Sequence, residues 1–288
     1  DGRGESDFRN RYDARANLVS FSDRIKLYAI SSANNTGADP TGDVDELLRP
    51  AGNSHIPGDE VAGEYLLPLS RPYIAQFKRD RYYFNEALFG SLHGIFRPTK
   101  NFKLAVHGHF FGDRTRFFTA RRSDYYTPTD TVRFGEQAIA ENQERYGYFQ
   151  GIAEYEISKD MMVRYRARLN GHRSEAGQQS TLNMNDVSGR LESSTNVQDH
   201  HLNVTRKFSE RTAATVDLRF LSDDRPQDYG LDGNLVGGYF GVPASDTLKQ
   251  SNDLLTRFYL CEVNLFRKEK SGKLGLRAGY EHLEESVN

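Results

Sequence analysis

The feature that most restricts this 288-residue sequence is a two-residue alternation of apolar and polar side chains. In residues 161–170 the even positions include three arginines, and the odd positions are all apolar or aromatic. Residues 102–110, 214–220 and 274–281 alternate in the same way. Consecutive side chains of a β-strand point to opposite faces, and helical spacing is nowhere sustained. The sequence therefore predicts an all-β protein.

The composition is polar, with a mean hydropathy of -0.71 and 37% hydrophobic residues. A strand of a membrane β-barrel needs apolar residues on only one of its faces, so this average is compatible with a membrane barrel. Because no run of about 18 apolar residues is present, a transmembrane helix is excluded. The balance of 38 basic and 40 acidic residues gives no general attraction to nucleic acid.

The connections between the predicted strands alternate between short and long. Short polar turns are predicted near Ser22 and Asp23, Thr99, Lys159, Glu210 and Ser271. Long connections are predicted over residues 34–80, 113–142, 170–196 and 222–251. This layout is typical of an outer-membrane barrel and not of a β-sandwich, whose turn signals recur every 8–12 residues or so. We expect about ten antiparallel transmembrane strands, each of roughly 9 to 15 residues, in one region covering residues 1–288.

Two segments carry a family resemblance. The first has an aromatic and polar lead-in, an alternating strand through Leu18, the turn at Ser22 and Asp23, and a second strand over residues 24–30. It resembles the first barrel hairpin of the TonB-dependent receptors of the Bacteroidota. Residues 79–118 resemble a later hairpin of such a barrel.

The resemblance implies an antiparallel β-barrel of about 22 strands in the bacterial outer membrane, of which about ten are present here. The family's plug domain, its TonB box and its C-terminal closing strand have no counterpart in the sequence. A receptor of this family imports a bound ligand, such as a siderophore, a glycan or a peptide. The implied partners are the TonB complex, outer-membrane lipids and a surface lipoprotein, with no nucleic acid and no cofactor.

Catalytic motifs are absent from the sequence. It contains no G-x-S-x-G elbow, Walker motif, H-E-x-x-H or paired Cys-x-x-Cys, so we expect no enzyme activity. Two alternatives to a receptor stay open. One is a structural or assembly barrel in a surface or secretion complex, and the other is a complete ten-strand barrel that acts as an enzyme or adhesin.

Three arginines are the first candidate ligand-binding residues. Arg164, Arg166 and Arg168 share one strand face, which we expect to line the lumen. They are suited to attract an anionic ligand or to line a conduction path. The alternative is that they pair with carboxylates on neighbouring strands, such as Glu154 and Glu156.

Histidines form the second candidate group. A three-residue turn at 99–101 would place His93 opposite His107, and Ser91 opposite His109, on the lumen face. His107 and His109 are therefore candidate ligand-binding residues. The cluster of three imidazoles is a candidate metal site, and a polar lumen lining without a metal is the alternative.

Overall fold

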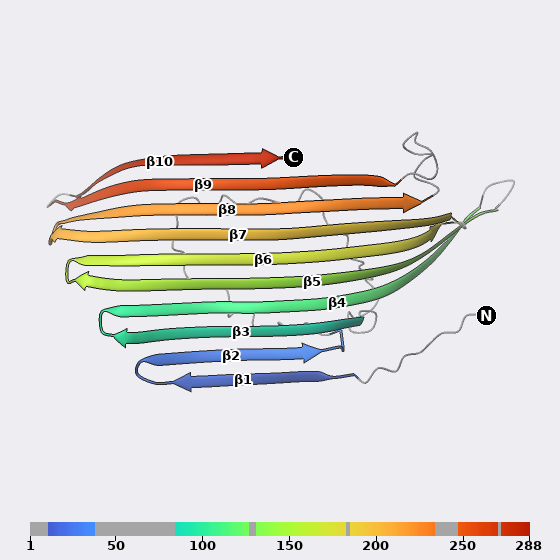
Figure 1. Cartoon of the computed structure of the whole chain (residues 1–288), viewed down its shortest axis with the longest axis horizontal. Coiled ribbons are helices and arrows are strands. Elements are labelled where there is room, and N and C mark those ends of the chain that lie inside the picture. Colours follow the sequence, from blue (N-terminus) through green and yellow to red (C-terminus); the bar gives the residue numbers. More distant parts are fainter. Residues whose placement is uncertain (1–10, 38–83, 127–130, 183–184, 234–246, 270–271) are drawn as a thin grey trace.

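A computed structural model describes residues 11–37, 84–126, 131–182, 185–233, 247–269 and 272–288. The described residues form one antiparallel sheet in which each strand pairs with the strands next to it in sequence (Figure 1). The strands are β1 (Asp13–Phe21), β2 (Ile25–Asn34), β3 (Phe84–Thr99), β4 (Phe102–Tyr126), β5 (Thr131–Ser158), β6 (Met161–Leu182), β7 (Asn185–Ser209), β8 (Thr212–Gly233), β9 (Leu248–Lys268) and β10 (Lys273–Val287).

The predicted all-β class and the predicted ten strands are confirmed. The sheet formed by the described residues is open, because β1 and β10 are its two edges and do not pair with each other. A closed barrel is therefore not formed by these ten strands. No helix in the described ranges is long and apolar enough to cross a membrane.

The five connections that were predicted to be short all lie at one end of the sheet (Figure 1). The turns predicted near Ser22, Thr99, Lys159 and Glu210 are confirmed. The β3–β4 turn is tighter than predicted. It consists of Lys100 and Asn101, with a register shift between Phe96 and Thr99 in place of a third turn residue. Ser271 is outside the described residues, but the amide of Glu269 donates to the carbonyl of Gly272 across that turn at 2.9 Å.

Two of the predicted long connections, 113–142 and 170–196, are wrong because the strands continue through them. The strands β8 and β9 also occupy the two ends of the connection predicted over 222–251, and the connection predicted over 34–80 lies mostly outside the described residues. β4 extends to Tyr126 and β5 begins at Thr131, so the connection predicted over 113–142 is a paired hairpin. The same is true of 170–196, where β6 and β7 pair as far as Leu182 and Asn185. Strands β4 to β9 are therefore 21 to 28 residues long, longer than predicted. Residues 38–83 and 234–246 are outside the described part.

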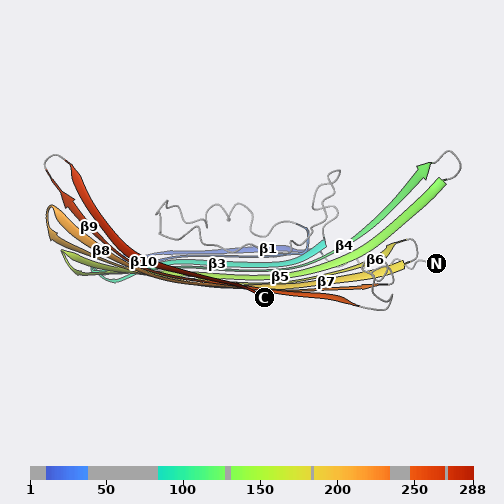
Figure 2. The same cartoon turned by 90° about the horizontal axis from the view of Figure 1, so that it is seen from above.

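The sheet is curved when seen along its edge, and β4 and β5 extend well beyond their neighbours at the end opposite the short turns (Figure 2). The twist of neighbouring strands gives any large antiparallel sheet a curvature of this kind. The paired extension of β4 and β5 runs from the pair Arg116 and Glu141 to the pair Tyr126 and Thr131.

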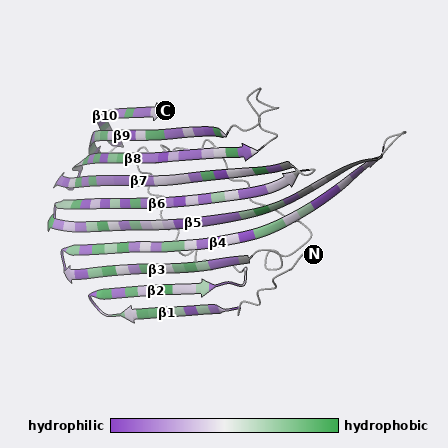
Figure 3. Cartoon of the chain, turned by 45° about the vertical axis from the view of Figure 1, so that its right-hand side comes forward, coloured by the Kyte–Doolittle hydropathy of each residue, from purple (hydrophilic) through white to green (hydrophobic). Residues whose placement is uncertain are grey.

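Hydrophilic and hydrophobic residues alternate along the strands, as predicted (Figure 3), so the two faces of the sheet differ in chemistry. We call the side that carries Asp199 the polar face, and the other side the apolar face. One register row of the polar face contains Tyr28, His93, His107, Gln150, Arg168, Asp199, Leu221 and Phe258. Buried polar residues are common on this face, whereas the large side chains of the apolar face are mostly exposed.

A small hydrophobic cluster on the polar face joins three strands. It consists of Val197 on β7, Leu221 on β8, and Phe258 and Leu260 on β9. Leu221 is 2% exposed and lies directly opposite Asp199 and Phe258 in the register. The cluster therefore packs against the polar residues described below.

The Leu221→Ala variant should lower the free energy of unfolding by about 2 to 4 kcal/mol, because it leaves a cavity in this cluster. The measurement is chemical unfolding followed by circular dichroism. Leu276→Ala is the control, since Leu276 is 66% exposed on the apolar face, and its loss should stay below about 1 kcal/mol. Equal losses in the two variants would contradict this placement of the core.

Candidate functional site

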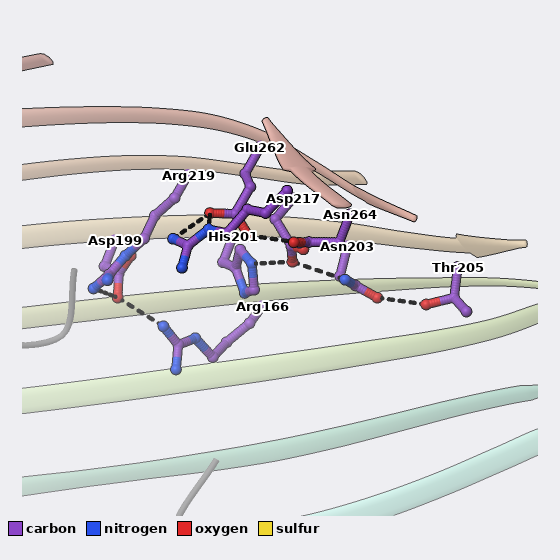
Figure 4. A network of polar contacts seen from close by, with 10 residues as sticks. Arg166, Asp199, His201, Asn203, Thr205, Asp217, Arg219, Glu262 and Asn264 are labelled. Carbon is purple, nitrogen blue, oxygen red and sulfur yellow. Dashed lines mark hydrogen bonds and ion pairs between the residues drawn. The ribbon is translucent and has the colours of Figure 1, made fainter. Parts of the chain in front are cut away.

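The centre of the polar face is the carboxylate of Asp199 on β7, which is 0% exposed (Figure 4). Arg219 on β8 binds it with two nitrogens, Nε to Oδ1 at 2.9 Å and Nη2 to Oδ2 at 3.2 Å. From the other side, β6 contributes Nη2 of Arg166 and of Arg168, at 3.1 and 3.0 Å from Oδ2. One carboxylate thus holds three guanidinium groups from two neighbouring strands.

This arrangement follows from strand register. Arg168 lies directly opposite Asp199, and Arg166 lies opposite His201, two positions away on the same face. Because side chains repeat every two residues, the arginines at 166 and 168 both reach the carboxylate. Arg168 is the more accessible of the two β6 arginines, with 33% of its side chain exposed.

A second polar group is centred on Asp217 of β8 (Figure 4). His201 Nε2 lies 3.0 Å from its Oδ1, and the amide of Asn203 donates to the same oxygen at 2.7 Å. Thr205 in turn donates to Asn203 at 3.0 Å. On β9, the buried Glu262 pairs with Arg277 of β10. Polar contacts therefore join β6, β7 and β8, and a separate ion pair joins β9 to β10, where Glu262 is the register partner of Asp217.

The third predicted arginine has a different partner. Arg164 lies opposite Glu154 of β5, with Nε and Oε1 3.4 Å apart. Lys103 of β4 approaches Glu154 from the far side at 3.0 Å. Carboxylates on neighbouring strands therefore hold all three candidate arginines, the arrangement that the sequence analysis gave as the alternative to an anionic ligand.

The histidine cluster forms in the predicted register, with His93 opposite His107 and Ser91 opposite His109. Its rings pack in contact with one another and with two tyrosines of β5. His107 lies 5.7 Å from His93 and 5.5 Å from His109 between ring centroids. His109 stacks on Tyr148 at 5.0 Å and on Tyr146 at 5.3 Å.

The chemistry of this cluster is that of an aromatic stack with polar edges. Across the described residues, no group of three or more His, Cys, Asp or Glu side chains has the arrangement to hold a metal ion. His200 and His201 separate to opposite faces, as strand geometry predicts. His201 binds Asp217 on the polar face, and His200 accepts or donates a 2.7 Å hydrogen bond with Tyr165 on the apolar face.

The apolar face carries a second feature, which we call the apolar belt. On eight strands the apolar-face positions include a run that contains only apolar residues, aromatic residues (His200 included) and glycine. The run is nine residues long on β3, β4 and β6, seven on β5, β8, β9 and β10, and five on β7. These runs are 88–96 on β3, 102–110 on β4, 149–155 on β5, 161–169 on β6, 200–204 on β7, 214–220 on β8, 259–265 on β9 and 274–280 on β10. The large side chains of the belt include many exposed hydrophobic residues.

The belt crosses the strands obliquely. Its edge away from the short turns moves from Leu88 on β3 to Tyr280 on β10. One register row shows the change, because Leu92, Gly108, Phe149 and Leu169 continue into Gln198, Ser222, Arg257 and Glu284. The displacement is about one residue for each strand crossed, which is the kind of stagger that tilted strands of a barrel have.

Sequence reasoning missed Asp199, Arg219 and Asp217. The signal for Asp199 was present, because the short turn near Glu210 pairs it with Leu221 and so places it beside Arg219. Its contact with the β6 arginines depends on the hairpin that joins β6 to β7, and the expectation of a long loop there prevented any register from being assigned.

The sequence matches no protein-family model, and no curated protein is significantly similar to it.

The Asp199→Asn variant should lower the free energy of unfolding by about 3 to 5 kcal/mol, because it leaves buried guanidinium groups without their carboxylate. Glu285→Gln is the matched control. It makes the same chemical change at an exposed carboxylate on β10, and it should alter stability by less than about 0.5 kcal/mol. Chemical unfolding of both variants measures the difference. If Asp199→Asn were as stable as Glu285→Gln, Asp199 would not be the organising charge of the polar face.

Proposed function

We propose that this chain is part of a transmembrane β-barrel in a bacterial outer membrane, and that the barrel is a TonB-dependent receptor that imports a bound ligand. The observation that carries the membrane part of the proposal is the oblique apolar belt. The lipid-facing surface of an outer-membrane barrel is an apolar band of limited height, while its inner surface is polar. The two faces of this sheet differ in the same way.

The dimensions of the belt support this proposal. A shift of one residue, about 3.3 Å, for each strand spacing of about 4.8 Å corresponds to a tilt of about 35°, close to that of membrane barrel strands. Nine residues of strand rise about 27 Å along the strand, or about 22 Å after this tilt, against the band of about 25 Å in known barrels. The longest runs of the belt, on β3, β4 and β6, thus approach the height of that band, and the runs on the other five strands are shorter.

Aromatic rings at the edge of the belt give further support. Across β7 to β10, His200, Phe220, Tyr259 and His282 form a continuous row with centroid separations of 5.2 to 6.3 Å. Tyr165 extends the row through its hydroxyl group, which is hydrogen-bonded to His200. Rings with polar groups are typical of the aromatic girdle at a membrane surface, where one part of the ring is in lipid and the other meets water.

The receptor part of the proposal rests on the resemblance of residues 2–37 and 79–118 to barrel hairpins of TonB-dependent receptors. The polar face would line the lumen, and the long hairpins would extend above the outer surface. Loops and strand ends in that position are where ligands are bound. The proposed partners are the TonB complex, the lipids of the outer membrane and a surface lipoprotein. The chain would act in transport and not in catalysis.

The single cysteine offers a direct test of the membrane proposal. Cys261 is exposed at an apolar-face position inside the belt. A nitroxide attached to it in protein reconstituted into phosphatidylcholine vesicles should collide more with oxygen, which concentrates in lipid, than with a water-soluble nickel chelate. Electron paramagnetic resonance measures both collision rates.

The control places the same label beyond the belt. In a Cys261→Ser background, Ser251→Cys puts a thiol at an exposed position on the same face of the same strand, eight residues from the belt edge at Tyr259. Its label should collide more with the nickel chelate. A label at Cys261 that collides more with the nickel chelate than with oxygen would contradict the membrane proposal.

A genetic comparison tests the transport proposal. Deletion of this gene in the source bacterium should impair growth on a subset of the nutrients whose use also fails when TonB is deleted. Growth on a panel of iron complexes, glycans and peptides is the measurement. If the deletion instead removed a surface structure or secreted protein and left every TonB-dependent nutrient in use, the chain would be an assembly barrel.

A further inference from the structure

Two arginines face each other across β5 and β6 immediately beyond the apolar belt. Arg145 and Arg173 are direct register partners on the apolar face. The next pair toward the belt is Gly147 with Gly171, and the pair after that is Phe149 with Leu169, where the belt begins. Like charges directly opposite each other in a sheet are unfavourable, so this pair calls for a source of negative charge.

The neighbouring carboxylates satisfy only one of the two arginines. Arg173 lies 3.0 Å from Glu175 and 3.9 Å from Glu192. Glu192 is shared with Arg190, which it binds at 2.7 Å, so two arginines and two glutamates balance each other on β6 and β7.

Arg145 lies outside that balanced group. Its register partner on β4 is Gly112, which brings no charge. The nearest acidic residue on the same face of β5, Glu141, is taken by Arg114 and Arg116, at 3.8 and 3.2 Å. In the described part of the chain, no carboxylate is within ion-pair distance of the exposed Arg145 side chain.

The glycines leave open space next to this cation. A Cβ atom added at Gly171 would meet nothing within 4 Å, and one added at Gly147 would meet only the carbonyl of Gly171, at 4.0 Å. A strip of bare backbone therefore separates the arginine pair from Phe149 and Leu169. A group bound to the arginines could lie flat on this strip and continue into the belt.

We propose that Arg145 and Arg173 bind the phosphate of a lipid headgroup, with the glycine strip under the headgroup and the acyl chains against the apolar belt. This inference rests on the proposed membrane location. Guanidinium groups bind phosphate oxygens through paired hydrogen bonds, and a phosphate held between the two arginines would supply the negative charge that Arg145 lacks. The order of charge, bare backbone and apolar surface matches the order of phosphate, glycerol and acyl chain in a phospholipid.

The test is native mass spectrometry of the protein in an uncharged detergent, titrated with three probes. These are phosphatidylglycerol, a galactosyl diacylglycerol that lacks phosphate, and inorganic phosphate. The wild type should bind phosphatidylglycerol at least about tenfold more tightly than the glycolipid, as expected for charge-assisted hydrogen bonds. Inorganic phosphate should bind too weakly to compete.

Three variants identify the site. Replacing both residues, Arg145→Gln with Arg173→Gln, should weaken phosphatidylglycerol binding by about tenfold or more. Arg145→Glu should also lose binding while it keeps the fold, since it places opposite charges across the strands. Arg116→Gln is the control, because Arg116 is an exposed arginine of the same face that is farther from the belt and already paired with Glu141. Its lipid binding should stay within about twofold of the wild type.

Three outcomes would overturn the inference: unchanged phosphatidylglycerol binding in the double variant, equal affinity for the glycolipid, or displacement of the lipid by inorganic phosphate at equal concentration. The last would assign the arginines to a free anion. The Cys261 label separates this failure from failure of the membrane proposal, because its oxygen accessibility does not depend on Arg145 or Arg173.

Discussion

A β-sheet is one residue thick, so every side chain of this protein must go to one of two faces. That constraint decides the rest of the structure. In each strand the residues at even positions lie on one face and those at odd positions lie on the other, so the two sets have different surroundings. On β6 one reading gives Met161, Val163 and Tyr165, and the other gives Arg164, Arg166 and Arg168. A single-residue slip in register would exchange them, so the difference between the faces also specifies the pairing.

The polar face shows how charges are kept in a sheet. Arg219 and Arg166 are buried, and burial of a guanidinium group is costly unless it is paired. Asp199 lies on β7, the strand between β6 and β8, and it pairs with both of these arginines and with Arg168. Removing Asp199 would therefore disturb three strands at once, whereas removing an exposed partner such as Arg168 would disturb one contact. Charges on the polar face are thus held in ion pairs between neighbouring strands.

Much of this architecture can be read from the sequence where turns are short. The pairing of His93 with His107 follows from a tight turn and a count of residues, and the structure has this pairing. The turn itself is one residue shorter than predicted, and the register shift between Phe96 and Thr99 makes up the difference. The counting fails at the other end of the strands. Residues 113–126 lack the apolar alternation because both of their faces are polar or mixed, and a strand whose faces are alike cannot be told from a loop by periodicity. Asp199 was missed for the same reason, since its contacts to β6 depend on the hairpin beyond the belt.

The paired extension of β4 and β5 has a consequence for how this end of the molecule meets other molecules. A loop of the same length would have to give up conformational freedom in order to hold a ligand, and that loss would oppose binding. Here interstrand backbone hydrogen bonds already restrict Arg116, Phe118 and their neighbours. The paired ends of β4 and β5 are already ordered, so binding a ligand there would cost little conformational entropy. Recognition there would depend on the shape and the chemistry that these ends present before the ligand arrives.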